Sequence, residues 1–154
     1  MEYFPTLPTV GETTDFIRRM QDMYAARRYC YFAINHLESG HFIGFIGLCD
    51  QVYPSPFTPC VDIGWRIHKE FWGMGLATEG AIKCLDYAFN SVGISHVRSI
   101  APAANLKSIQ VMEKIGMEYL GSFEHPKLGA FPSLVICVCY EATDSDIISK
   151  STNK

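Results

Sequence analysis

Apolar and polar positions recur along the chain with two different periods, which predict helices and strands in turn. Between residues 10 and 28, apolar side chains return every three or four positions with charged side chains between them, as in an amphipathic helix. Thr9 and Glu12 have the spacing of a capping box at its start. Residues 76–90 and 105–116 show the same period and predict two further helices.

Runs rich in aromatic and β-branched residues predict strands between these helices. Two of them flank the turn at residues 38–41 and predict a hairpin. The loop 51–59 contains three prolines and is unsuited to a central strand. The predicted strands are 29–37, 42–48, 60–68, 96–101, 117–123 and 133–142. Helices that alternate with strands in this way predict an α/β fold with a mixed sheet and helices on both faces.

The composition predicts one ordered domain. The chain has 154 residues, 48% of them hydrophobic and 19% charged, which excludes a disordered protein. We assign residues 1–142 to the domain and residues 143–154 to a polar tail. The net charge of −3 argues against nucleic-acid binding through a basic surface, so an anionic ligand needs a local positive field.

The chain lacks the sequence signals of membrane insertion and secretion. It has no run of eighteen apolar residues and no basic start followed by an apolar stretch. Its six cysteines show neither metal-ligand spacing nor a disulfide pattern. We therefore expect thiols in a reducing cytoplasm, with no metal and no membrane partner.

Residues 72–77, Trp-Gly-Met-Gly-Leu-Ala, join the strand that ends near His68 to a helix. Two glycines allow a tight turn, and a helix N-terminus carries partial positive charge, so the segment suits a phosphate. Glycines before a helix also occur in simple turns, and the spacing alone leaves both interpretations open. It is not a Walker loop, because no Gly-Lys-Ser/Thr follows. It is not a dinucleotide fingerprint either, because Thr78 stands where the third glycine of Gly-x-Gly-x-x-Gly would fall.

A second motif makes the interpretation specific. The chain contains FIGFIGL (42–48), VDIGWRIHKEFWGMGLATEG (61–80) and NLKSIQVMEKIGM (105–117), in this order. Over about residues 1–142 it resembles GNAT-superfamily N-acetyltransferases of the RimJ/RimL-like group, which acetylate ribosomal-protein N-termini. The resemblance implies a mixed, splayed sheet and acetyl-CoA as co-substrate. It also implies a primary amine as acceptor, either a protein N-terminal α-amine or a small-molecule amine.

The resemblance implies a position for acetyl-CoA between the strands 60–68 and 96–101. Its pantetheine arm would pair with the backbone of residues 65–67, and its pyrophosphate would lie on the amides of residues 72–77. The implied cofactor-binding residues are Trp65, Arg66, Ile67, Trp72, Gly73, Met74, Gly75, Leu76, Ala77, Asn105 and Ser108.

The catalytic candidates are Ser108, Asp62 and Asn105. Many members have a tyrosine as acid seven residues after the asparagine; here Met112 stands there, and Ser108 is the substitute that the resemblance implies. Asp62 would be the base, acting directly or through water. It could instead be a strand carboxylate paired with Arg66, and Ser108 could be only a first-turn helix residue. Asn105 and Ser108 would face the thioester.

Two further features leave alternatives open. Family members have a strand and a helix ahead of the segment that matches residues 2–5, where this chain begins. The sheet would then start at residues 29–37 with a bare edge, which predicts a homodimer. His125 either shapes the acceptor pocket or occupies a turn. The alternative function, favoured by the missing strand and by Met112, is a non-catalytic acyl-CoA-binding or regulatory protein.

Overall fold

Helix α1 (Val10–Arg27) begins at the predicted capping box. The computed structural model describes residues 8–144. In it the Thr9 hydroxyl accepts the Glu12 N–H at 3.1 Å, and the Glu12 carboxylate accepts the Thr9 N–H at 2.7 Å. The helix ends at Arg28, whose φ of 69° is left-handed, so the predicted end near Arg28 is confirmed.

The remaining helices follow the predicted order with one difference. A 3-10 turn, η1 (Lys69–Phe71), precedes α2 (Leu76–Asp86), and α3 (Leu106–Lys114) starts one residue after Asn105. The single helix expected at 76–90 is wrong in detail, because after Asp86 it continues as the π-helical segment η2 (Tyr87–Val92). A wider last turn closes this segment, in which the Gly93 N–H donates to the Ala88 carbonyl.

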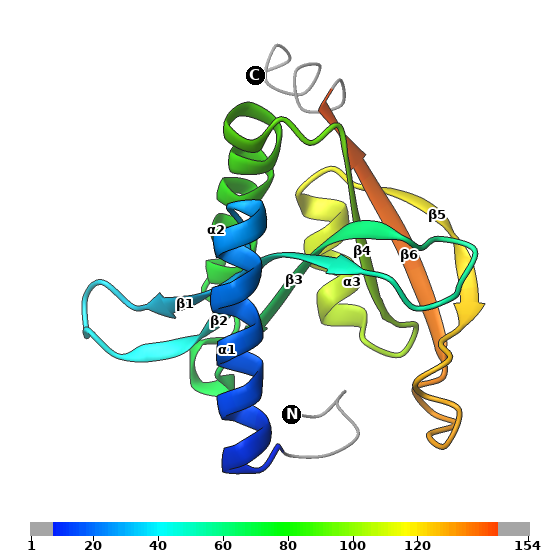
Figure 1. Ribbon diagram of the computed structural model, residues 1–154, viewed down its shortest axis with the longest axis horizontal. Coiled ribbons are helices and arrows are strands. Elements are labelled where there is room, and N and C mark those ends of the chain that lie inside the picture. Colours follow the sequence, from blue (N-terminus) through cyan, green and yellow to red (C-terminus); the bar gives the residue numbers. More distant parts are fainter. Residues whose placement is uncertain (1–7, 145–154) are drawn as a thin grey trace.

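Six strands form one mixed sheet (Figure 1). They are β1 (Tyr31–Asn35), β2 (Phe42–Gln51), β3 (Cys60–Ile67), β4 (His96–Pro102), β5 (Glu118–Glu124) and β6 (Ile136–Thr143). Their order is β1-β2-β3-β4-β6-β5. All neighbours are antiparallel except β3 and β4, which are parallel. The strand expected from residue 133 begins three residues later, because residues 128–135 are held in turns by Phe131 and its neighbours.

The parallel strands β3 and β4 diverge. Asp62 and Arg98 are the one pair of facing residues between them, whereas β2 and β3 pair from Gly44–Ile67 to Gln51–Cys60. The edge of β3 that faces β4 is therefore open along residues 65–67. This is the splayed sheet that the family resemblance implies.

Helices cover both faces of the sheet, as expected (Figure 1). On one face α2 and α3 bury the main core, in which Leu48, Ile63, Leu85 and Met112 are almost fully enclosed. On the other face α1 packs Met20 against Cys49. This arrangement leaves the open edge of β3 next to the first turns of α2 and α3.

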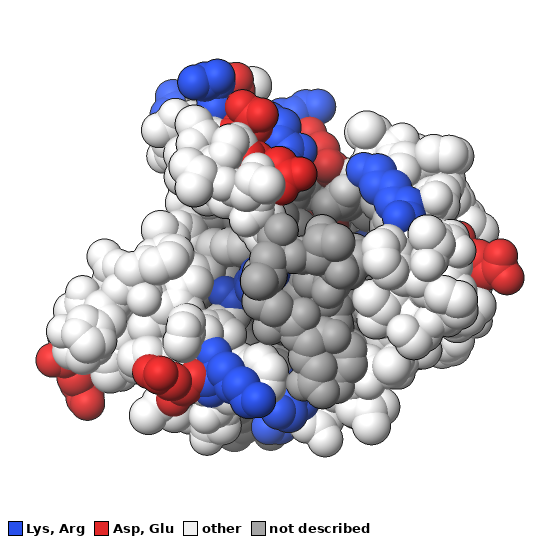
Figure 2. All heavy atoms as spheres, turned by 90° about the horizontal axis from the view of Figure 1, so that it is seen from below, with Lys and Arg blue, Asp and Glu red and all other residues white. Residues whose placement is uncertain are grey.

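The cysteines and the surface charges agree with an ordinary folded domain. All six cysteines are free thiols, and Cys137 and Cys139 pack on one face of β6 against Phe123. Figure 2 shows that charged side chains on the face drawn there form small groups of both signs. Within residues 8–144, no helix combines the length and the apolar character needed to cross a bilayer. The proposed tail, residues 143–154, falls mostly outside the described residues.

Candidate active site

A groove of about 400 Å³ opens where β3 and β4 separate. One wall is the end of β3 with the loop that follows it and the first turn of α2, and the other is one side of α3 along its length. The lining residues are Trp65, Arg66, Ile67, Phe71, Trp72, Gly73, Gly75, Leu76, Ala77, Thr78, Asn105, Lys107, Ser108, Gln110, Val111 and Lys114. Every residue that the sequence assigns to the cofactor therefore lies along this groove, except Met74, whose side chain is 59% exposed.

The N-terminus of α2 lies in the groove without a side-chain cap. Gly73 and Gly75 have φ values of 77° and 74°, a left-handed conformation that favours glycine. Thr9 and Asn105 cap α1 and α3 with side-chain oxygens, but no side chain of the described residues does so for α2. The first amides of a helix have no acceptor within the helix, so those of α2 can bind an anionic ligand.

The charges that line the groove have one sign. Arg66, Lys107 and Lys114 contribute three cationic side chains, and the described lining residues include no aspartate or glutamate. The chain as a whole carries a net charge of −3. The groove therefore provides the local positive field that an anion requires in this acidic protein.

The N-terminus of α3 brings Asn105 and Ser108 into the same groove. The Asn105 side-chain oxygen accepts the Ser108 backbone N–H at 3.2 Å, which caps the helix and fixes both residues relative to each other. Met112 points into the core and is 1% exposed, so it is remote from any ligand in the groove. Ser108 carries the one hydroxyl group of α3, and it lines the groove.

Sequence reasoning missed several residues of the groove. Lys107, Gln110, Val111 and Lys114 all lie on the side of α3 that faces it. Their spacing of three or four residues is the helical period, which extends from Ser108 and could have identified them. Phe71 and Thr78 flank the glycine loop and could have been found by extending that motif.

Asp62 lies outside the lining of the groove and is only 6% exposed. It stands at the point where β3 and β4 part, opposite Arg98. Its carboxylate accepts the Tyr31 hydroxyl at 2.5 Å. Burial raises the pKa of Asp62 to about 7, against the opposing effect of hydrogen bonds from Tyr31, Gln51 and the Ile100 backbone. A carboxylate in this position can take a proton only through an intermediary such as water.

His125 lies in the turn between β5 and β6. Its ring centre is 4.3 Å from that of Tyr53, and its Nδ1 accepts the Lys127 N–H at 3.1 Å. Burial, and then the charge of Lys127, lower its pKa. A neutral histidine in contact with an aromatic ring is compatible with either role, so its part in the acceptor pocket stays a prediction.

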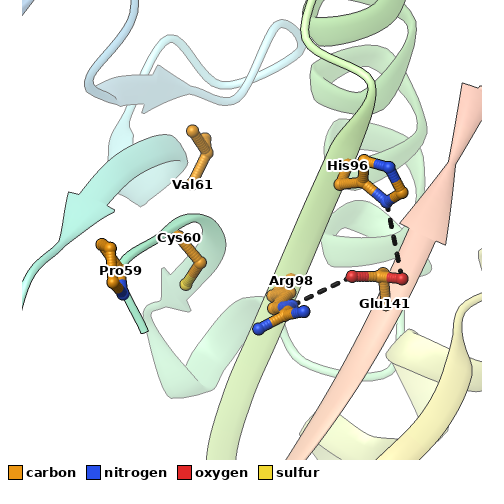
Figure 3. Close-up of a pocket in the computed structure, with 6 residues that line it drawn as sticks. All are labelled: Pro59, Cys60, Val61, His96, Arg98 and Glu141. Carbon is orange, nitrogen blue, oxygen red and sulfur yellow. Dashed lines mark hydrogen bonds and ion pairs between the residues drawn. The ribbon is translucent and has the colours of Figure 1, made fainter. Parts of the chain in front are cut away.

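A second cavity, of about 310 Å³, lies at the N-terminal ends of β3 and β4, away from the groove (Figure 3). Its lining residues are Pro59, Cys60, Val61, His96, Arg98 and Glu141. Glu141 pairs with Arg98 at 2.9 Å and with His96 at 3.6 Å, and Arg98 also donates to the Phe57 carbonyl at 2.6 Å. These polar groups satisfy one another and join β4 to β6. In the part of the chain that is described, no three His, Cys, Asp or Glu side chains gather as metal ligands.

A sheet split between two parallel strands, with an uncapped helix and cationic side chains beside the split, is suited to a phosphate-bearing ligand. The family model for the acetyltransferase (GNAT) domain matches residues 1–118. The chain belongs to this family of acetyltransferases, which are transferases that use acetyl-CoA. The resemblance noted in the sequence is confirmed.

Individual relatives extend the comparison. The chain is 29% identical over 119 residues to YkkB of Bacillus subtilis (strain 168). The aligned region covers 77% of this chain and 68% of that protein. It is 33% identical over 88 residues to FsC-acetyl coenzyme A-N(2)-transacetylase of Aspergillus fumigatus, covering 54% of this chain and 37% of that protein. The chain thus spans between about a third and two thirds of these relatives.

A solved structure shares the fold. The ribosomal-protein-S5-alanine acetyltransferase from Vibrio fischeri superposes with a TM-score of 0.74 at 15% identity. The match covers 93% of this chain and 79% of that one. At this identity the likeness describes the architecture alone.

Proposed function

We propose that the chain is an acetyl-CoA-dependent N-acetyltransferase that moves an acetyl group to a primary amine by direct attack on the thioester. The observation that carries the proposal is the uncapped N-terminus of α2, in a groove with three cationic side chains and no lining carboxylate. Such a site suits the pyrophosphate of coenzyme A. The open edge of β3 beside it offers backbone groups to the pantetheine amides.

Each implied cofactor-binding segment has a task in this proposal. The backbone of residues 72–77 holds the pyrophosphate, and Lys107 and Lys114 add positive charge nearby. Residues 65–67 pair with pantetheine as an added strand. The Ile67 carbonyl accepts the Trp72 indole N–H at 2.7 Å, so the pantetheine either uses neighbouring backbone groups or displaces this bond.

The chemistry needs no enzyme nucleophile. The amine nitrogen attacks the thioester carbon, a C–N bond forms, and the C–S bond breaks to release coenzyme A. The proton lost by the amine passes through water to Asp62. Ser108 either gives its hydroxyl proton to the departing sulfur and regains one from water, or steers a proton from water to the sulfur. Asn105 holds Ser108 in place through the cap. Proximity of the two substrates supplies the remaining acceleration.

The acceptor is proposed as a protein N-terminal α-amine or a small-molecule amine. The name of the Vibrio fischeri enzyme specifies an alanine of a ribosomal protein, and that of the Aspergillus fumigatus enzyme specifies an N(2) nitrogen. Both are nitrogen acceptors. His125 and Tyr53 are the candidate border of the acceptor pocket, since they join two loops that connect strands.

The burial of Asp62 favours a second candidate, a non-catalytic acyl-CoA-binding or regulatory protein. A turnover assay separates the two. We expect acetyl-CoA to raise the melting temperature of the protein, and coenzyme A thiol to appear when peptide N-termini or small amines are added. Stabilisation by acetyl-CoA without thiol release from any amine would select the non-catalytic candidate. If acetyl-CoA neither stabilises the protein nor releases coenzyme A, both candidates are rejected.

A further inference from the structure

Three neighbouring strands bring Tyr31, Gln51 and Asp62 together on the face of the sheet covered by α1. The Tyr31 hydroxyl donates to Asp62 Oδ2 at 2.5 Å, and Gln51 Nε2 lies 3.5 Å from the same hydroxyl. A separation of 2.5 Å is in the range of hydrogen bonds from a hydroxyl to a charged oxygen. The mechanism proposed above uses Asp62 but assigns nothing to Tyr31.

Packing fixes the Tyr31 ring independently of Asp62. The ring stacks on Phe45 of β2, with centroids 5.3 Å apart, and on Phe16 of α1, with centroids 6.3 Å apart. It also lies directly over Gly64 of β3, where an added Cβ would come within 3.0 Å of the Tyr31 hydroxyl. The absence of a side chain at Gly64 thus gives the tyrosine the room it needs to reach across β3 to Asp62.

We infer that Tyr31 is the positioning residue of the catalytic base: its hydroxyl orients the Asp62 carboxylate and favours its ionised form. This inference rests on the proposed function, because it assumes that Asp62 accepts the amine proton. A hydrogen-bond donor stabilises a carboxylate more than a carboxylic acid, and the effect is large where water is excluded. Without this donor, Asp62 would be protonated over most of the neutral pH range.

The other groups around Asp62 are nearly all neutral. The titratable side chains that interact with it from β2, the loop after it, β3 and β6 are Cys49, Tyr53, Cys60 and Cys139, all with pKa values raised chiefly by burial. Arg98 on β4 is the one cation that faces it in register, and it is engaged by Glu141 and the Phe57 carbonyl. The donors that act on the carboxylate are therefore Tyr31, Gln51 and the Ile100 backbone.

The test uses two matched tyrosine variants. Tyr31→Phe removes the hydroxyl and keeps the stacked ring. Tyr29→Phe is the control, because the Tyr29 hydroxyl donates to a different carboxylate, that of Asp50, at the same distance of 2.5 Å. Two measurements are made on each protein: the pH profile of kcat/KM with acetyl-CoA and an amine, and the ¹³C titration of the Asp62 carboxyl, assigned with Asp62→Asn.

We expect Tyr31→Phe to move both the acid limb of kcat/KM and the Asp62 titration to higher pH by about one to two units, the equivalent of a hydrogen bond to a charged group. Activity then falls about tenfold or more below neutrality and recovers at high pH, while the affinity for acetyl-CoA is unchanged. Tyr29→Phe should leave both curves in place. If Tyr31→Phe fails to fold, Gln51→Leu should move both curves in the same direction by a smaller amount.

Two results would overturn the inference. In the first, Tyr31→Phe shifts the Asp62 titration no more than the control Tyr29→Phe does. In the second, Tyr31→Phe shifts the Asp62 titration but not the acid limb of the kcat/KM profile. Failure of the proposed function gives a different result, in which the unmodified protein acetylates no amine. The carboxyl titration still decides in that case whether Tyr31 controls the protonation of Asp62.

Discussion

The ammonium of Lys107 lies 4.0 Å from the centre of the Trp72 indole ring. Lys107 belongs to the first turn of α3 and Trp72 to the loop before α2, so this cation–π contact joins the two walls of the groove. Trp72 is held from its other end, where its N–H donates to the Ile67 carbonyl. A phosphate group entering the groove would compete with the indole ring for the Lys107 charge.

This contact gives a first prediction about the cofactor. Lys107→Gln should weaken acetyl-CoA binding by about three- to tenfold, because one of three cationic side chains beside the phosphate site is lost. The loss should shrink as salt is raised. Lys83→Gln on the exposed side of α2 is the matched control and should bind normally. Equal affinities of the two variants in calorimetry would remove Lys107 from the site.

The glycine loop gives a second prediction. Gly75→Asp places a carboxylate at the start of α2, where the phosphate should lie, and should lower acetyl-CoA affinity more than tenfold, or over about 1.4 kcal/mol. Gly93→Asp controls for backbone strain, since Gly93 has a similar φ of 84° and equally open space around it. An unchanged dissociation constant for Gly75→Asp would contradict the assignment of the loop to the cofactor.

The features of the fold and of the site differ in how far the sequence could predict them. The capping box at Thr9, the glycine loop at 72–77 and the Asn105 cap are local signals, because residues a few positions apart decide each of them. The contact between Tyr31 and Asp62 depends on the register of three strands, which no local pattern contains. Alternation along β3 indicates that Asp62 and Ile63 face opposite sides of the sheet. It does not indicate which side chains of the neighbouring strands reach Asp62.

The α3 N-terminus gives a third prediction. Ser108→Ala should lower kcat by roughly 10²–10⁴-fold with little change in acetyl-CoA affinity, if the hydroxyl handles the proton of the leaving thiol. Ser91→Ala, at an exposed position in η2, should be silent. A full rate in Ser108→Ala would mean that proximity and electrostatic stabilisation of the oxyanion suffice.

Asn105 should behave differently from Ser108. Asn105→Ala removes the cap of α3 and should lower the free energy of unfolding by about 1 kcal/mol. It should also reduce kcat, because the Ser108 backbone N–H loses its acceptor. Restoring a cap with Asn105→Asp should return stability. Recovery of stability without recovery of kcat would assign the amide group itself to the reaction.

The edge of the sheet gives a prediction about assembly. Among residues 8–144, strand β1 is the first in the sheet order, and Phe32 on it is 36% exposed, in edge-on contact with Tyr24 of α1. We propose that a second copy of the chain pairs along this edge. Light scattering should then report a dimer that Phe32→Glu dissociates and Phe42→Glu, also exposed, does not. A monomer at high micromolar concentration would contradict the pairing.

The buried base gives the last prediction, which concerns stability. In the folded protein the pKa of Asp62 is about 7, and its ordinary value is 3.8. At pH values between 3.8 and about 7, Asp62 has lost its proton in the unfolded chain but keeps it in the folded chain. The free energy of unfolding of the unmodified protein therefore falls as pH rises from about 4 to about 7, and this contribution is constant beyond pH 7.

Asp62→Asn keeps an acceptor for the Tyr31 hydroxyl and cannot ionise. Its free energy of unfolding should exceed that of the unmodified protein by up to about 4 kcal/mol above pH 7, and the excess should vanish toward pH 4. Asp50→Asn is the comparison of opposite sign, because it loses the 3.0 Å ion pair with Arg27 and should be destabilised at neutral pH. Urea unfolding at several pH values measures both. An Asp62→Asn protein that is less stable than the unmodified one at pH 8 would contradict this prediction and show that the buried carboxylate stabilises the fold.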